Sequence, residues 1–178
     1  MGKISDAPLG ILFFAITVNE KKLFKTIETI LERKYGNILF ESEIINFSDK
    51  TNYYQKEMGN SLWKKYYSYE KIISLEKIYK YKHESNEIEN EFKSNEKRNI
   101  NLDPGYITLF NFSLLTTKGY SHRIYLESGI YSEITLVFKN KKYEFLPWTY
   151  PDYKSKNVSQ LLENSRLFLK RYLLEDNK

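Results

Sequence analysis

Residues Leu9–Val18 read LGILFFAITV and form the longest apolar stretch of the chain. This stretch has about half the length that a helix needs to cross a bilayer. A short apolar run that is followed at once by a polar residue, here Asn19, is typical of a strand buried on both faces of a sheet. We therefore predict that Leu9–Val18 is a central strand and that the chain does not enter a membrane.

The first half of the chain continues with a helical pattern and then with alternating strand and helix patterns. Gly36 is suited to end this helix. The helix is predicted from apolar residues at helical spacing: Leu23, Phe24, Ile27, Ile30, Leu31 and Tyr35. The next segments are predicted as a strand, a polar loop, a strand, a helix, a charged linker and a short strand: Asn37–Phe47, Ser48–Gly59, Leu62–Ile73, Leu75–Phe92, Lys93–Arg98 and Asn99–Tyr106. This order predicts a split βαβ (ferredoxin-like) N-terminal core.

The second half is predicted to extend that core. Asp103-Pro104-Gly105 is expected to end the short strand, because Pro104 fixes its own φ and Gly105 permits a sharp turn. The following segments are predicted as a helix, the two strands of a hairpin, a further strand, a rigid aromatic loop and a terminal helix: Ile107–Leu115, Tyr120–Leu126, Ile130–Phe138, Lys142–Leu146, Pro147–Tyr153 and Val158–Leu173. We expect a single α+β domain over residues 1–178.

Composition narrows the compartment and the partners. The 178 residues include no cysteine, which excludes disulfides, thiolate metal sites and cysteine nucleophiles, and fits a reducing compartment. No signal peptide is visible, so we expect a cytoplasmic protein. The formal net charge is +5, but the lysines and arginines are spread over both halves. Because a phosphate-binding surface needs clustered cations, an RNA partner ranks below a small molecule.

Several motifs of known chemistry are absent from the sequence. It contains no G-x-x-x-x-G-K-[ST] phosphate loop, no G-x-G-x-x-G fingerprint and no G-x-S-x-G elbow. We therefore predict no cofactor. With His83 and His122 as the two histidines, a zinc site would need carboxylates as its other ligands. We assign no metal ligands.

The predicted hairpin separates two candidate residues. A three-residue loop at Glu127-Ser128-Gly129 makes Arg123 face Glu133 across the strands, and alternation then puts His122 and Arg123 on opposite faces. His122 is either a core histidine or a neutral imidazole that acts as a general base or binds phosphate. Arg123 is either the ion-pair partner of Glu133 or an anion-binding arginine that Glu133 holds in place.

Two neighbouring segments also have a structural and a functional interpretation. Lys118, together with Thr117, is either a lysine near the end of a helix or part of a cradle for a phosphate or carboxylate. The rigid loop that holds Trp148, Tyr150 and Asp152 either plugs the sheet against the last helix or stacks on and covers a ligand.

A polar triad lies on the second predicted helix. Lys82, Asn86 and Glu89 share one helix face, which is either solvated or part of a buried network. Asp103 and Tyr106 follow on the short strand. From Asp103 onward, about fifty residues of loops and strand ends hold most of the candidates, and function concentrates on such loops.

Several stretches carry a family resemblance: Asn101–Tyr106, Thr116–Lys118, Ser121–Leu126, Gly129–Tyr131, Glu133–Leu136 and Pro147–Tyr153. Together with Tyr54, Glu57, Lys82, Asn86 and Glu89, they resemble an uncharacterised bacterial family, domain of unknown function 4416. The resemblance covers nearly the whole chain and implies that these residues form one constellation, with Tyr54, Glu57 and the helical triad in supporting positions. It implies no activity.

Our leading hypothesis is a pocket for a small anionic ligand, nucleotide- or phosphate-like. Asp103 or His122 would transfer protons, and the ligand would contact Tyr106, Thr117, Lys118, Arg123, Glu133, Trp148, Tyr150 and Asp152. The alternatives are a non-catalytic protein- or RNA-interaction module and a metal-dependent hydrolase. The sequence leaves open whether the ligand is turned over and which oligomer forms. The leading hypothesis requires Asp103, Lys118 and either His122 or Arg123 to share one concave pocket.

Overall fold

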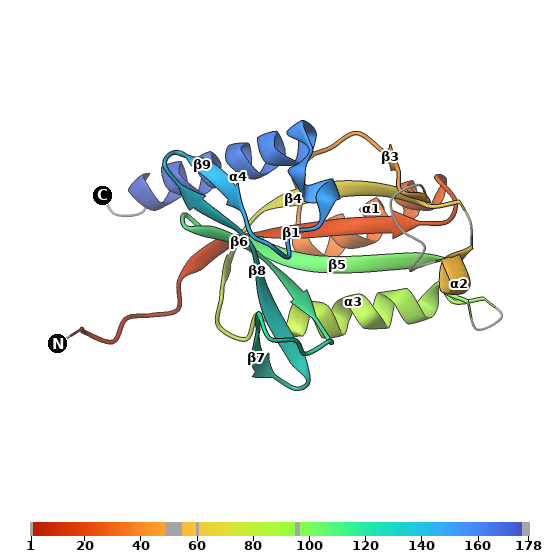
Figure 1. Ribbon diagram of the computed structural model, residues 1–178, viewed down its shortest axis with the longest axis horizontal. Coiled ribbons are helices and arrows are strands. Elements are labelled where there is room, and N and C mark those ends of the chain that lie inside the picture. The colour runs from red at the N-terminus through yellow and green to blue at the C-terminus, as the bar shows by residue number, and fades with distance from the viewer. Residues whose placement is uncertain (1, 49–54, 60, 95–96, 176–178) are drawn as a thin grey trace.

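Figure 1 shows the computed structural model of the chain, which describes residues 2–48, 55–59, 61–94 and 97–175. Its elements are, in chain order, β1 (Leu9–Val18), α1 (Leu23–Tyr35), β2 (Ile38–Glu41), β3 (Ile45–Asn46), α2 (Gln55–Met58), β4 (Trp63–Ser74), α3 (Lys80–Glu91), β5 (Ile100–Ile107), β6 (Asn111–Thr116), β7 (Arg123–Glu127), β8 (Ile130–Lys139), β9 (Lys142–Phe145), the 3-10 helix η2 (Pro151–Lys154) and α4 (Lys156–Glu175).

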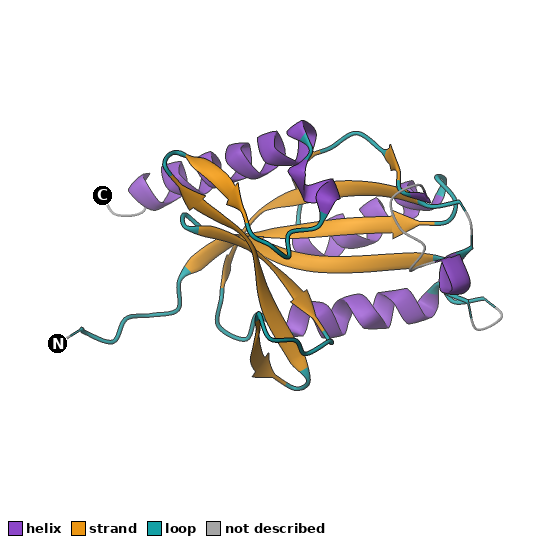
Figure 2. Ribbon diagram, viewed as in Figure 1, coloured by secondary structure: helices purple, strands orange, loops and turns teal. Residues whose placement is uncertain are grey.

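The fold is a mixed α+β structure around one antiparallel sheet (Figure 2). Within the described residues, nine strands follow the order β2-β4-β1-β5-β6-β8-β7, with β3 beside β4 and β9 beside β8. Helices cover both faces of the sheet. In the same residues, no helix is both long and apolar enough to span a membrane.

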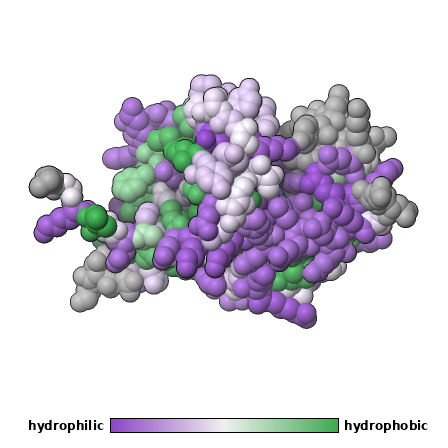
Figure 3. Space-filling model, turned by 90° about the horizontal axis from the view of Figure 1, so that it is seen from below, coloured by the Kyte–Doolittle hydropathy of each residue, from purple (hydrophilic) through white to green (hydrophobic). Residues whose placement is uncertain are grey.

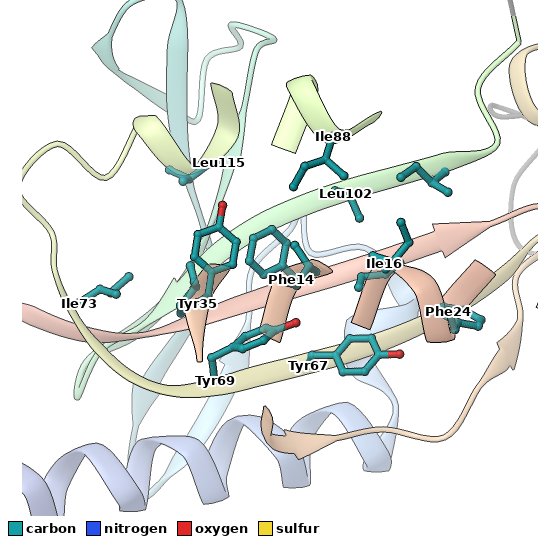
Figure 4. Close-up of a cluster of buried hydrophobic side chains, with 14 of the residues drawn as sticks. Phe14, Ile16, Phe24, Tyr35, Tyr67, Tyr69, Ile73, Ile88, Leu102 and Leu115 are labelled. Carbon is teal, nitrogen blue, oxygen red and sulfur yellow. The ribbon is translucent and has the colours of Figure 1, made fainter. Parts of the chain in front are cut away.

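The predicted central strand is confirmed as β1, which pairs with β4 on one side and β5 on the other. Its side chains alternate between two cores. Phe14 and Ile16 pack with α1 and α3 on one face (Figure 4), whereas Ile11 and Phe13 pack with α4 on the other. Burial on both faces explains why this strand has no alternation of polar and apolar residues.

The structure corrects two boundaries in the first half. The predicted strand Asn37–Phe47 is divided into β2 and β3 around Ser42, whose Oγ accepts a hydrogen bond from the N–H of Tyr66 (3.0 Å). The second helix begins at Lys80, later than predicted, because the φ of Lys77 is +56° and cannot continue an α-helix. The first predicted helix and the strand after the polar loop are confirmed as α1 and β4.

The predicted helix Ile107–Leu115 is wrong. Its residues form the end of β5, a tight turn and β6, which pairs with both β5 and β8. Thr108 closes the turn, since its Oγ1 accepts hydrogen bonds from the N–H groups of Phe110 (3.1 Å) and Asn111 (3.0 Å). A short apolar run has no distinctive period, so pairing with two neighbouring strands decides its structure.

The predicted turn at Asp103-Pro104-Gly105 is also wrong, because all three residues lie inside β5. A Cβ on Gly105 would lie 2.5 Å from the carbonyl oxygen of Ser113, so glycine is needed for β5 and β6 to approach each other. Pro104 removes no hydrogen bond between strands. The N–H of Leu102, two residues earlier on the same edge, points to a side chain of α3 instead of to a strand.

The hairpin register is confirmed for Arg123 with Glu133 and for Tyr125 with Tyr131. Its loop is shorter than predicted. Ser128 (φ +52°) and Gly129 (φ +79°) both have positive φ, as a two-residue type I′ turn requires, and a bulge before the turn absorbs the difference. The later segments are confirmed as β9 and α4, and the aromatic loop ends in η2.

The outer edge of β5 positions the site. β6 pairs with β5 only from Gly105 onward, so in the described part of the chain residues 100–104 have no strand on that side. Helix α3 lies beside them instead (Figure 1). Beyond β5 the sheet twists strongly, and β6 and β8 cross the direction of β1 and β4 at a steep angle (Figure 2).

Candidate functional site

A cleft of about 1020 Å³ opens along the outer edge of β5. One wall comes from α3 and β5, the opposite wall from β6, the loop after it and β8, and a third side from η2. Figure 3 views the protein from the side of α3, where the surface is mostly hydrophilic. The charged residues that line the cleft are Glu57, Lys64, Lys82, Glu89, Lys93, Arg98, Asp103, Lys118, Arg123, Glu133 and Asp152.

Two side chains of α3 take the place of a strand at Leu102. Glu89 Oε1 accepts a hydrogen bond from the Leu102 N–H (2.7 Å), and Lys82 Nζ donates one to the Leu102 carbonyl oxygen (2.7 Å). Both side chains are buried. Side chains of α3 therefore satisfy the N–H and the carbonyl group of Leu102 at the edge of β5. The neighbouring residues Asn101 and Asp103 line the cleft.

These side chains belong to a larger network of charges. Arg98 bonds both Glu57 and Glu89, and Lys82 Nζ lies 3.7 Å from Glu89 Oε1 and 3.6 Å from Asp103 Oδ1. Burial raises the pKa of Glu89 above its usual value, although Lys82, the Leu102 N–H and Arg98 oppose the shift. The helical triad is thus a buried, hydrogen-bonded network at Lys82 and Glu89 and not a solvated face.

On the opposite wall, Glu133 holds His122 and Arg123 together. Its Oε2 lies 3.0 Å from His122 Nε2 and accepts a hydrogen bond from Arg123 Nε (2.7 Å). Glu133 is 2% exposed, and its Oε1 is buried without a hydrogen bond from any described residue. Arg123 Nη1 also donates to the carbonyl oxygen of Lys118 (2.9 Å), which fixes the loop between β6 and β7.

The sequence-based separation of His122 and Arg123 is wrong. β7 begins only at Arg123, so His122 lies in the turn before it, where strand alternation does not apply. The ring of His122 stacks on Trp148 and meets the ring of Tyr120 edge to face. Both His122 and Arg123 consequently line the cleft and share one carboxylate.

The third side of the cleft is held by a buried ion pair. Asp152 Oδ2 accepts hydrogen bonds from Lys64 Nζ (2.7 Å) and from the Tyr66 hydroxyl (2.6 Å). Burial alone would raise the pKa of Asp152, but the charge of Lys64 and these hydrogen bonds outweigh it and lower the pKa. The Lys64 ammonium also lies 4.5 Å from the ring centre of Phe47 and 5.2 Å from that of Tyr153. The ion pair between Lys64 and Asp152 therefore ties η2 to β4.

Most of the residues proposed from the sequence line this one cleft: Glu57, Lys82, Asn86, Glu89, Asp103, Thr117, Lys118, His122, Arg123, Glu133, Tyr150 and Asp152. Two do not. Tyr106 packs against the core on the α1 side of the sheet, and its hydroxyl lies 2.9 Å from Ser132 Oγ. Trp148 stacks on the ring of His122 and does not itself line the cleft. Tyr54 lies outside the described residues. Lys118 follows a strand and not a helix, because the helix predicted before it is β6.

Sequence reasoning missed Lys64, Arg98 and Asn101. Lys64 interrupts an aromatic strand, and a charge at an inward position is the signal that could have identified it. Arg98 had been assigned to a charged linker, and Asn101 shares a strand face with Asp103, to which its amide donates a hydrogen bond (2.8 Å). In the described ranges, no three His, Asp or Glu side chains gather closely enough to hold a metal ion.

One of three comparisons with known proteins gives a match. Residues 8–168 match the model of a family described as domain of unknown function (DUF4416). No curated protein and no solved structure matches the chain. Every candidate residue of the cleft lies within the matched range.

Proposed function

The chain belongs to the family described as domain of unknown function (DUF4416), as its motifs predicted, and because that description names no activity we propose a function from the cleft alone. We propose that the cleft binds a small ligand through a phosphate or carboxylate group. The observation that carries this proposal is the convergence of Asp103, Lys118, His122 and Arg123 on one cleft. Asp103 on β5 and the residues that follow β6 supply a carboxylate, cations and an imidazole to the same space.

Arg123 is the residue that would bind the anion. Its Nε and Nη1 are used by Glu133 and by the Lys118 carbonyl, whereas Nη2 makes no hydrogen bond to any described residue. A guanidinium held at two of its nitrogens has lost much of its rotational freedom before a ligand arrives. Its remaining N–H groups are therefore well prepared for a phosphate or carboxylate oxygen.

His122 is the residue that would move a proton if the ligand is turned over. Its Nε2 faces the buried Glu133, and its Nδ1 has no hydrogen-bond partner among the described residues. A carboxylate at one ring nitrogen favours the tautomer that leaves the other nitrogen as an acceptor. The stacked ring of Trp148 fixes the plane of the imidazole. Together these contacts support a general-base role for Nδ1.

A thermal-shift screen tests the binding proposal. Inorganic phosphate, nucleoside monophosphates and sugar phosphates at millimolar concentration are expected to raise the Tm of the wild-type protein, because a ligand that binds only the folded state stabilises it. Arg123→Gln should abolish the shift. Arg171→Gln, an exposed change on α4 that removes the same charge outside the cleft, should keep it. The proposal is wrong if no compound stabilises the wild-type protein.

We also propose that the first half is a split βαβ, ferredoxin-like unit. The support is the strand order β2-β4-β1-β5 with antiparallel neighbours, and the packing of α1 and α3 on the same face. In that unit β1 and β4 are central, and each helix connects two strands that are not adjacent. Superposition of an experimental structure on ferredoxin-like folds tests the assignment.

A further inference from the structure

The wall formed by α3 and β5 holds carboxylates and cations that face one another. Three carboxylates, Glu57, Glu89 and Asp103, share two cations, Lys82 and Arg98. Glu57 and Lys93, which both border the cleft, are exposed, so water screens their charges. Of the buried groups, Lys82 has to serve both Glu89 and Asp103.

Asp103 is less well satisfied than Glu89. Glu89 is buried and accepts hydrogen bonds from Leu102 and Arg98. Asp103, by contrast, accepts one hydrogen bond from the described residues, from Asn101 (2.8 Å), and its 3.6 Å separation from Lys82 Nζ is too long for a second. Its side chain is 29% exposed and borders the cleft. The Asp103 carboxylate thus has acceptor positions left that a ligand can fill.

The opposite wall brings Arg123 and His122 to the cleft. Glu133 is the carboxylate there, and it serves Arg123 and His122 at the same time. Lys118 adds a further positive charge at the rim of that wall. A cleft with the Asp103 carboxylate on one wall and the Arg123 guanidinium on the other favours a molecule whose own charges are separated in the reverse sense.

We propose that the ligand is dipolar, with a protonated amine that binds Asp103 and a phosphate or carboxylate that binds Arg123. This inference rests on the proposed function, because it takes the anion site at Arg123 as given and adds the second end of the ligand. An ammonium group satisfies Asp103 better than a hydroxyl, since it supplies a positive charge as well as hydrogen bonds. The amide of Asn86, which also lines the cleft, can accept a further hydrogen bond from the amine.

A pair of simple phosphates tests the proposal by isothermal titration calorimetry. Phosphoethanolamine and ethyl phosphate differ in the presence of the ammonium group, so their Kd ratio reports on the amine site. We expect phosphoethanolamine to bind about tenfold more tightly to the wild-type protein, as one charge-assisted hydrogen bond predicts. Hydroxyethyl phosphate should resemble ethyl phosphate.

Two variants assign the effect to Asp103. Asp103→Asn should bring the two Kd values to within about twofold of each other, because the ammonium then loses its charged partner. The same variant should bind ethyl phosphate as the wild type does, which shows that it is folded. Glu91→Gln removes a negative charge from the exposed part of α3, outside the cleft, and should keep the wild-type ratio.

The outcomes separate this inference from the binding proposal. Equal binding of all three compounds to the wild-type protein overturns the dipolar ligand but leaves the anion site in place. Hydroxyethyl phosphate binding as tightly as phosphoethanolamine also overturns it, in favour of a neutral donor. If none of the three binds, and inorganic phosphate does not bind either, then the anion site and the dipolar ligand are both wrong.

Discussion

Trp148 lies flat against His122: the ring centroids are 4.7 Å apart and the planes differ by 16°. The indole N–H donates a hydrogen bond to the carbonyl oxygen of Ile134 (2.7 Å), which fixes Trp148 to β8. Glu133, the residue before Ile134, contacts Nε2 at the edge of the same imidazole (3.0 Å). Adjacent residues of one strand therefore set both the plane of His122 and its hydrogen bond.

This relationship predicts a specific effect of Trp148→Phe. The variant keeps an aromatic ring but loses the indole hydrogen bond, so we expect the free energy of unfolding to fall by about 1 kcal/mol. The imidazole signals of His122 should shift or broaden in proton NMR spectra, while those of His83, the other histidine, should not. Unchanged His122 signals in a folded variant would contradict the positioning role of Trp148.

Two carboxylates of the cleft predict opposite pH dependences. The pKa of Asp152 is below its ordinary value of 3.8, so its stabilising contribution is present above that value and is lost as the pH falls through the folded pKa. The pKa of Glu89 is above its ordinary value of 4.5, so its contribution is present below 4.5 and is lost as the pH rises through the folded pKa. The two residues therefore act in different directions on acidification.

Urea unfolding between pH 3 and pH 7 checks this pair. At neutral pH, Asp152→Asn should destabilise the protein by about 3–5 kcal/mol, because it leaves Lys64 buried without its partner. That difference from wild type should shrink as the pH falls below 3.8. Relative to Glu89→Gln, the wild type should instead gain stability as the pH falls toward 4.5. Parallel pH profiles for the three proteins would contradict the assignment.

Two glycines predict different costs for the same substitution. A Cβ at Gly105 meets the Ser113 carbonyl oxygen at 2.5 Å, so Gly105→Ala forces β5 and β6 apart and should cost about 3 kcal/mol. Gly129→Ala meets no atom within 4 Å, and its cost of about 1 kcal/mol comes from a φ of +79° in the left-handed region. Equal losses of stability for the two variants in urea unfolding would show that the close approach of the strands is not limiting.

The parts of the fold that local patterns determine could be predicted from the sequence. The apolar run at Leu9–Val18, the helical stripe of α1 and the register of Arg123 with Glu133 each follow from a period of the chain itself. The segment Ile107–Leu115 could not be predicted in the same way. It is short and apolar, and its structure depends on the two strands that it meets.

The candidate site was predicted as a set of residues but not as a geometry. Lys82 and Glu89 were identified by their helical spacing, yet their role depends on the edge of β5 at Leu102, which no helical pattern encodes. Lys64 was missed because its partner Asp152 is 88 positions away in the chain. Contacts between such distant residues become visible only when the sheet is assembled.

The hydrogen bonds that the side chains of Glu89 and Lys82 make with Leu102 also block the addition of a strand from another copy of the chain. An unpaired strand edge is a template on which another chain can add a strand, and proteins commonly block such edges to remain dispersed at high concentration. Glu89 and Lys82 occupy the donor and the acceptor of Leu102, so an incoming strand finds neither free. The same two residues thereby close this edge of the sheet to self-association and leave the cleft beside it open to the proposed ligand.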